Sequence, residues 1–299
     1  MKTLCIAALS LITGCLEFHR GPLPDAPTNA TYADVDGVHL RFHDKGEGPA
    51  VVMIHGFASS LETWDVVAPK LEKNHRVLSL DLKGFGWSGR PEGDYSPAAQ
   101  AKLVLGLMKQ RGIERASIVG HSWGSSVALA TTLADPTRID RIALYDAWVY
   151  EDQLPTFFLW ARQPAIGETL FALWYDQRAD ERMAHAFFDK RYVTEPLAEA
   201  VEASLERPGT KAAALAATRG QYFLPLEARY KTIRHKTLLM WGREDEVTLL
   251  GFGERLSKDL PNSRLVVYPQ CGHFPMIEAA AASTRDLQDF LEPQPAQQP

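Results

Sequence analysis

Ser122 stands between Gly120 and Gly124 in the stretch SIVGHSWGSS, which has an apolar run before the serine and small residues after it. The pattern G-x-S-x-G is typical of a serine placed at a sharp turn from a strand into a helix. Glycine on both sides removes Cβ atoms that would clash where the helix packs against the strand. The turn lifts the hydroxyl above the sheet, at the positive end of a helix. These features predict that Ser122 is a nucleophile.

A serine becomes a useful nucleophile when a base takes its proton and an acid orients that base. His273 lies in a loop directly after the apolar stretch VVYP, and Asp245 follows the apolar stretch LLMWG. The order Ser122, Asp245, His273, with each residue just past a predicted strand, predicts a catalytic triad. Asp146, at the end of RIALYD, is a competing acid. We favour Asp245 because its loop follows the penultimate strand.

Three other residues near these motifs could also do chemistry, but we expect structural roles for them. His55 and His121 lie beside backbone that the loops around the serine need, so we expect structural hydrogen bonds from both imidazoles. Cys271 is two residues before His273, and a small buried side chain is the expected role for it.

Seven segments between residues 38 and 269 have the composition of strands, and several are almost continuously apolar, as in a parallel sheet covered on both faces. Helical patterns separate most of them, notably 97–110, which Ser96 and Pro97 introduce as N-cap and first residue. Alternating strands and helices predict an α/β fold with a mostly parallel central sheet flanked by helices. The predicted strands are 38–42, 50–55, 76–82, 116–120, 141–146, 236–242 and 264–269.

Residues 148–234 interrupt this alternation, because they contain helical, aromatic-rich pieces and no convincing strand. A plain crossover between two strands needs far fewer residues. We therefore predict a helical cap inserted between two parts of one core, 31–147 and 235–291, with a disordered tail at 292–299. Some aromatic residues of the cap should face the substrate, which favours a hydrophobic one.

Taken together, the motifs resemble the α/β-hydrolase superfamily, in its cap-bearing branch of small esterases, haloperoxidase-like and dehalogenase-like enzymes. The resemblance extends over 32–291 and includes HGF at 55–57, DLKGFGWSGRP at 81–91 and CGHFP at 271–275. It implies the α/β-hydrolase fold, with the cap inserted after the sixth strand. It also implies an oxyanion hole formed by the backbone N–H groups of Phe57 and Trp123.

GHSWGS at 120–125 resembles the nucleophile turn of dehalogenases and epoxide hydrolases, but serine stands where those enzymes have aspartate. Ser122 would therefore attack an acyl carbon, which predicts a carboxylic ester hydrolase acting on a small to medium hydrophobic ester. Alternatives on the same triad are a haloperoxidase-like perhydrolase, a carbon–carbon bond hydrolase and a proline-iminopeptidase-like aminopeptidase. A non-catalytic, membrane-tethered binding protein is the alternative from another class.

The first residues have the layout of a secretory signal: Lys2, an apolar run over 4–12, and then small residues. Ile12-Thr13-Gly14-Cys15 resembles the bacterial lipobox, which implies cleavage after residue 14 and a lipid on Cys15. Residues 15–30, rich in proline and polar side chains, would be a tether. The sequence thus predicts export and anchoring to a bacterial membrane, and Leu16 favours the outer membrane by analogy with that family. Without lipidation, the protein would be periplasmic or secreted.

Composition and motifs argue against several other classes. The net charge is -5, with lysine and arginine scattered along the chain, so no nucleic-acid partner is expected. No H-E-x-x-H pair or paired cysteines suggest a metal site. GFGWSG at 84–89 matches a dinucleotide-binding motif, but no acid follows at 103–110 and no helix pattern opens inside it. No cofactor is therefore expected.

Overall fold

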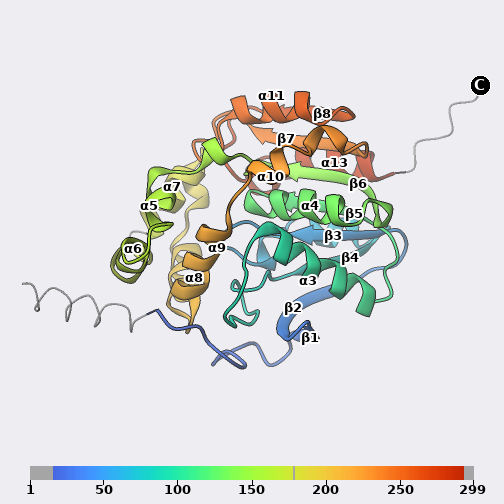
Figure 1. Cartoon of the computed structure of the whole chain (residues 1–299). Coiled ribbons are helices and arrows are strands. Elements are labelled where there is room, and N and C mark those ends of the chain that lie inside the picture. Colours follow the sequence, from blue (N-terminus) through green and yellow to red (C-terminus); the bar gives the residue numbers. More distant parts are fainter. Residues whose placement is uncertain (1–15, 178, 293–299) are drawn as a thin grey trace, which may run out of the picture.

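The computed structural model describes residues 16–177 and 179–292, whose centre is one eight-stranded sheet (Figure 1). The strand order is β1-β2-β4-β3-β5-β6-β7-β8. β1, β2 and β4 pair antiparallel, and all pairs from β4 through β3 to β8 are parallel. The strands are β1 (Thr31–Val35), β2 (Val38–Lys45), β3 (Ala50–Ile54), β4 (Arg76–Leu80), β5 (Ala116–His121), β6 (Ile139–Tyr145), β7 (Lys236–Gly242) and β8 (Ser263–Tyr268).

Helices cover both faces of the sheet, and the alternation of side chains along β3 shows how. Val52 and Ile54 belong to one hydrophobic cluster, and Val51 and Met53 belong to the other. Successive residues of a strand point to opposite faces, so a strand buried on both sides is apolar at every position. The first cluster includes α3 (Pro97–Gln110), α4 (Trp123–Ala134) and α11 (Leu250–Asp259), and the second includes α2 (Ala68–Leu71), α12 (Pro275–Glu278) and α13 (Ala280–Leu291). The predicted α/β fold is confirmed.

The strand β1 was not predicted from the sequence. Its residues TYADV are mostly exposed or half-buried, so the apolar pattern that marks the other strands is weak here. The hairpin to β2 turns at Asp36 and Gly37, which have φ values of 47° and 78°. An Asp-Gly pair is a strong hairpin signal because both central residues of this turn need positive φ. That pair could have identified the strand.

Between β6 and β7 the described chain forms only helices and loops, and most of these helices lie together at one side of the sheet (Figure 1). These elements occupy the segment predicted as a cap. They are α5 (Thr156–Ala161), α6 (Ile166–Trp174), α7 (Ala179–Ala186), α8 (Glu195–Glu206), α9 (Thr210–Gly220) and α10 (Leu224–Glu227). None of the helices within 16–177 and 179–292 has the length and hydropathy needed to cross a membrane.

The segment predicted as a tether, 15–30, packs against the domain over part of its length. The Phe18 ring stacks on that of Tyr95 with centroids 5.9 Å apart, and Leu23 is buried. Proline and polar residues dominate the segment, so its few apolar side chains did not signal this packing. Residues 1–14 and Cys15 lie outside the described residues, as does almost all of the predicted tail.

The turn from β5 into α4 is strained at Ser122, which has φ 51° and ψ -125°. A non-glycine residue in this region costs roughly 1–3 kcal/mol and persists only where its surroundings hold it. Here α4 lies so close to β3 that a Cβ on Gly124 would be 2.3 Å from the carbonyl oxygen of His55. The same atom on Gly120 would be 2.8 Å from the backbone nitrogen of Ser125. The two glycines thus allow the close packing that fixes the turn.

We expect Gly124→Ala to destabilise the protein by about 1–3 kcal/mol, because the methyl group would force α4 away from β3. Gly251→Ala is the matched control, since nothing lies within 4 Å of its added Cβ and the residue is inside helix α11. That substitution should raise stability by about 0.5–1 kcal/mol. Urea unfolding of the three proteins measures both effects, and equal stability of Gly124→Ala and the parent would contradict the packing argument.

Candidate active site

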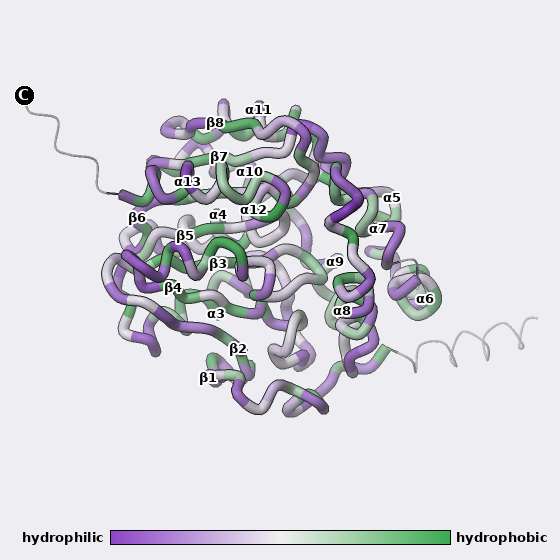
Figure 2. Tube along the Cα trace, turned by 180° about the vertical axis from the view of Figure 1, so that it is seen from behind, coloured by the Kyte–Doolittle hydropathy of each residue, from purple (hydrophilic) through white to green (hydrophobic). Residues whose placement is uncertain are grey.

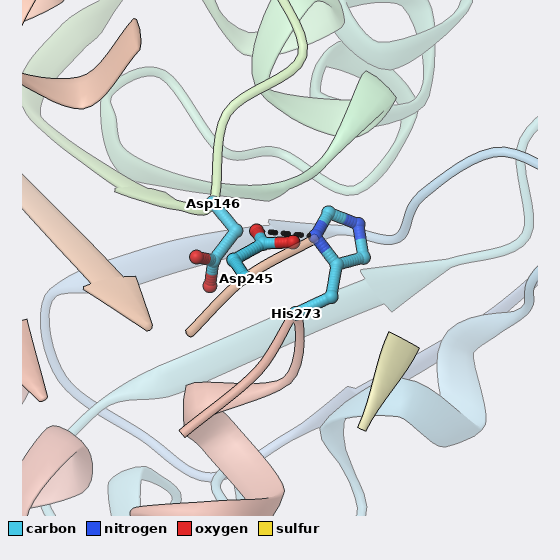
Figure 3. A group of neighbouring side chains, drawn as sticks. All are labelled: Asp146, Asp245 and His273. Atoms are coloured by element: carbon cyan, nitrogen blue, oxygen red, sulfur yellow. Dashed lines mark hydrogen bonds and ion pairs between the residues drawn. The ribbon is translucent and has the colours of Figure 1, made fainter. Parts of the chain in front are cut away.

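Asp245 and His273 come from the loops after β7 and β8 and meet in a hydrogen bond (Figure 3). Oδ2 of Asp245 lies 2.8 Å from Nδ1 of His273, and both side chains are buried. Oδ1 accepts the backbone N–H groups of Val247 and Thr248, and the Thr248 hydroxyl donates to Oδ2 at 2.6 Å. Burial alone would raise the pKa of Asp245, but the charge and hydrogen bond of His273 and the hydroxyl of Thr248 lower it. Asp245 is therefore a carboxylate that orients the imidazole.

Asp146, the competing acid, lies beside Asp245 at the end of β6 (Figure 3). Its Oδ1 accepts the N–H of Gly242 at 2.9 Å, whereas Oδ2 has no N–H or O–H donor among the described residues. Burial and the neighbouring charge of Asp245 raise the pKa of Asp146 well above its usual range. Two buried carboxylates in contact do not both ionise. The raised pKa favours the protonated, neutral form of Asp146 beside the ionised Asp245.

His273 and Ser122 are brought together through His121, the residue before the serine. The rings of His121 and His273 lie 4.8 Å apart, and Nε2–H of His121 donates to the backbone carbonyl of His273 at 2.8 Å. Burial and the nearby His273 lower the pKa of His121 well below its usual range, so this imidazole is neutral. Within the described chain, the hydrogen bonds of the His273 side chain are made by Nδ1. Nε2 has no hydrogen-bond partner among the described residues, Ser122 Oγ included.

The backbone N–H groups of Phe57 and Trp123 are held in place by their neighbours. His55 donates from Nδ1 to the carbonyl of Gly56 at 2.7 Å and accepts the Leu82 N–H at Nε2. Burial lowers the pKa of His55, which favours the neutral imidazole that can accept at Nε2. The N–H of Phe57 points opposite to that carbonyl because the peptide is trans and planar. Among the described residues, neither the Phe57 nor the Trp123 N–H donates a hydrogen bond. Both donors are therefore available, and their role as an oxyanion hole stays a prediction.

Aromatic side chains surround the nucleophile turn, and we call this group the aromatic cluster. Phe57 is at its centre, with ring centroids 5.2–6.0 Å from three other members. The backbone N–H of Trp148 donates to the carbonyl of Ser122 at 3.1 Å, which places the cluster against the serine. Phe158 is the contribution of the cap. The members are Phe57, Phe85, Trp123, Trp148 and Phe158.

The cap is joined directly to the loop that carries His273. The backbone N–H of His273 donates to the carbonyl of Ala186, the last residue of α7, at 2.7 Å. Glu278 accepts the N–H of Gly272 at 2.8 Å and the N–H of Asp189 at 2.9 Å, so one carboxylate binds the loop and the cap together. The histidine loop and the end of α7 thus form one hydrogen-bonded unit.

The structure brings Ser122, Asp245 and His273 to the same edge of the sheet and leaves Cys271 aside. The Cys271 thiol is fully buried, and burial raises its pKa, so it is no thiolate nucleophile. His55 and His121 make structural hydrogen bonds, as expected. The predicted lipidation site Cys15 lies outside the described residues.

Thr248 is a functional residue that sequence reasoning missed. An aspartate that accepts backbone N–H groups two and three residues later forms a recognisable turn, and a hydroxyl residue at the third position is its sequence signal.

Asp146, Asp245 and His273 could also present a metal with three ligand atoms within 4.8 Å of one another. A metal there would displace the proton between Nδ1 and Oδ2, so the geometry as it stands is that of an acid–base pair.

We expect Asp146→Asn to remove a pH-dependent cost of folding. The native state holds a proton on Asp146 that the unfolded chain releases above about pH 4, so this residue makes stability fall as pH rises toward its raised pKa. Asparagine keeps an acceptor for the Gly242 N–H and cannot ionise. The unfolding temperature of Asp146→Asn, relative to the parent, should therefore rise between about pH 5 and about pH 8. A relative unfolding temperature that stays flat or falls would contradict a neutral Asp146.

Comparison with known proteins agrees with this geometry. Residues 49–280 match the family model of the α/β hydrolase fold. The chain is 31% identical to the 2-hydroxymuconate semialdehyde hydrolase of Pseudomonas sp. strain CF600, over 85% of this chain and 91% of that protein. It is 32% identical to the 2-hydroxy-6-oxononadienedioate/2-hydroxy-6-oxononatrienedioate hydrolase of Comamonas testosteroni, over 84% and 91%.

A solved structure gives the same result. A meta-cleavage product hydrolase from Pseudomonas fluorescens is 29% identical, superposes with a TM-score of 0.73, and is matched over 87% of this chain and 96% of its own. The family match extends over most of the chain, and the relatives are hydrolases matched over nearly their whole length. This protein belongs to the α/β-hydrolase fold family and is a hydrolase.

Proposed function

We propose that this protein is a serine hydrolase that cleaves uncharged, hydrophobic carboxylic esters through an acyl-enzyme on Ser122. The observation that carries the proposal is the aromatic cluster packed against the nucleophile turn, next to the hydrogen-bonded pair Asp245 and His273. Its five aromatic members carry no charge, so they favour an apolar acyl group.

The proposed reaction begins when Ser122 Oγ attacks the ester carbonyl carbon and its proton passes to Nε2 of His273. The carbonyl oxygen becomes an oxyanion that accepts the N–H groups of Phe57 and Trp123. The intermediate then expels the alcohol oxygen, which takes the proton from Nε2. Water attacks the acyl-enzyme by the same steps in reverse order, which releases the acid and regenerates Ser122.

The ionisation states of the two aspartates support this proposal. A single ionised carboxylate, Asp245, faces Nδ1, so it stabilises the imidazolium that forms during proton transfer. Because Asp146 is neutral, the His273 imidazole is next to one negative charge and not two. The base can therefore release its proton to the leaving alcohol more readily than it could beside two carboxylates.

A second candidate is hydrolysis of a carbon–carbon bond, and the relatives favour it. Their names describe hydrolases of 2-hydroxy-6-oxo acids and of 2-hydroxymuconate semialdehyde. The same serine and histidine could attack the ketone carbon of such a substrate. However, an acid of this kind carries a carboxylate, and the aromatic cluster offers it no cation. We therefore place ester hydrolysis first.

We also propose that the hydrolase is exported and acylated on Cys15. This part rests on the apolar run over 4–12 and on the lipobox-like residues that precede the cysteine.

We expect hydrolysis of p-nitrophenyl acetate, butanoate and octanoate, with kcat/KM higher for the two longer acyl chains because they fill the aromatic cluster. Ser122→Ala should lower kcat by about 10⁴-fold or more, since no other group replaces the nucleophile. Spectrophotometric release of p-nitrophenol measures both. Ser125→Ala is the matched control: it removes a hydroxyl from the same helix that has no partner among the described residues, and it should retain activity.

A 2-hydroxy-6-oxo-dienoate is tested beside the esters, followed by loss of its absorbance. If the protein turns over the dienoate and none of the esters, the proposal of ester hydrolysis is wrong and carbon–carbon bond hydrolysis takes its place. Equal ester hydrolysis by the parent and Ser122→Ala would contradict both.

A further inference from the structure

The outer side of the cap carries a group of exposed apolar side chains on α5 and α6, which we call the outer apolar patch. Each is between 42% and 59% exposed, a large fraction for side chains of this size. Single exposed apolar residues are common on protein surfaces, but several on adjoining helices mark an interaction site. The five residues are Leu159, Trp160, Ile166, Leu173 and Trp174.

Helix α6 is apolar on both its inner and its outer side. Gly167 and Phe171 are buried against the cap, while Ile166 and Leu173 are exposed on the outside. Glu168 is the one charged residue of α6, and it is bound to Arg219 of α9 at 2.7 Å. A helix that is apolar all round is normally buried. Yet α6 lies at the edge of the molecule in Figure 1, and from behind in Figure 2.

The described chain begins next to the same part of the cap. Glu17 lines a hollow together with Asp176, two residues after α6, and with the turn between α8 and α9. Leu16 and Phe18 pack against the core, so this start is fixed to the domain. One residue adds about 3.8 Å of chain. The described chain thus starts beside the cap, and in the sequence the proposed acyl site is the residue that precedes Leu16.

We propose that the outer apolar patch rests on the surface of a lipid bilayer, with the acyl chain of Cys15 inserted beside it. The proposal uses the anchor proposed above and is independent of the reaction that the triad catalyses. Tryptophan and leucine side chains insert at the boundary between headgroups and acyl chains, where an apolar ring gains burial and its N–H stays hydrated. A lipid surface would also cover the apolar side chains that α5 and α6 expose on the same cap that the start of the described chain contacts.

The test places a fluorophore on the patch of the full-length protein. Leu173→Cys is labelled with an environment-sensitive nitrobenzoxadiazole dye. Val66→Cys is the matched control, because Val66 is also an exposed apolar residue but lies outside the cap. In the protein processed as proposed, Cys5 is removed with the leader, the Cys15 thiol is acylated and Cys271 is buried, so none of the three competes for the label. With vesicles of phosphatidylethanolamine and phosphatidylglycerol, the dye at 173 should brighten, and lipids that carry a quencher on their acyl chains should quench it. The dye at 66 should stay accessible to aqueous iodide.

A second measurement removes the anchor and keeps the patch. In the Cys15→Ser chain, Trp160→Glu together with Trp174→Glu should weaken partitioning onto these vesicles by about tenfold or more, while Val66→Glu should not. Equal partitioning of the patch and control variants would overturn the proposal, as would equal iodide quenching at 173 and 66. A dye at 173 that is already bright without vesicles would also overturn it. In that case, fluorescence that grows with protein concentration would indicate that a second copy of the protein covers the patch. Fluorescence independent of concentration would indicate that a segment of the same chain covers it.

Discussion

The active site depends on one constraint, the close packing of α4 against β3 and β5 that holds Ser122 in a left-handed backbone conformation. The strain at this residue directs its side chain out of the sheet and leaves the next N–H, that of Trp123, without an internal acceptor. Phe57 then needs only the correct peptide orientation, which His55 supplies by binding the carbonyl of Gly56. The backbone around Ser122 and the orientation of the Phe57 N–H are thus fixed by packing and hydrogen bonding within the chain.

A second organising feature is the small amount of charge buried at this edge of the sheet. Of the ionisable groups around the turn, Asp245 is charged, and four donors bind its two oxygens. Asp146 is protonated, and His121 is an uncharged imidazole. An unpaired buried charge costs several kcal/mol, so this distribution keeps the cost low and directs the one negative charge at Nδ1 of His273.

Periodicity and turn signals predicted most of the fold, because the parallel strands are buried on both faces and read as continuous apolar runs. They did not reveal β1, whose half-exposed residues carry little hydrophobic signal, or the packing of Phe18, a tertiary contact between distant segments. Motif order predicted that Asp245 and His273 lie together, which their hydrogen bond confirms, and the role of Ser122 as the nucleophile stays a prediction. The raised pKa of Asp146 could not be predicted from the sequence. It depends on burial and on the closeness of Asp245, which only the folded structure gives.

The hydrogen bond from the backbone of His273 to Ala186 gives the cap a mechanical link to the catalytic base. If α7 moves, either this hydrogen bond breaks or the backbone of His273 moves with the helix. Glu278 strengthens the link, because its carboxylate binds the N–H of Asp189 in the cap and the N–H of Gly272 in the histidine loop. A movement of the cap at this point would therefore also move the loop that carries the imidazole.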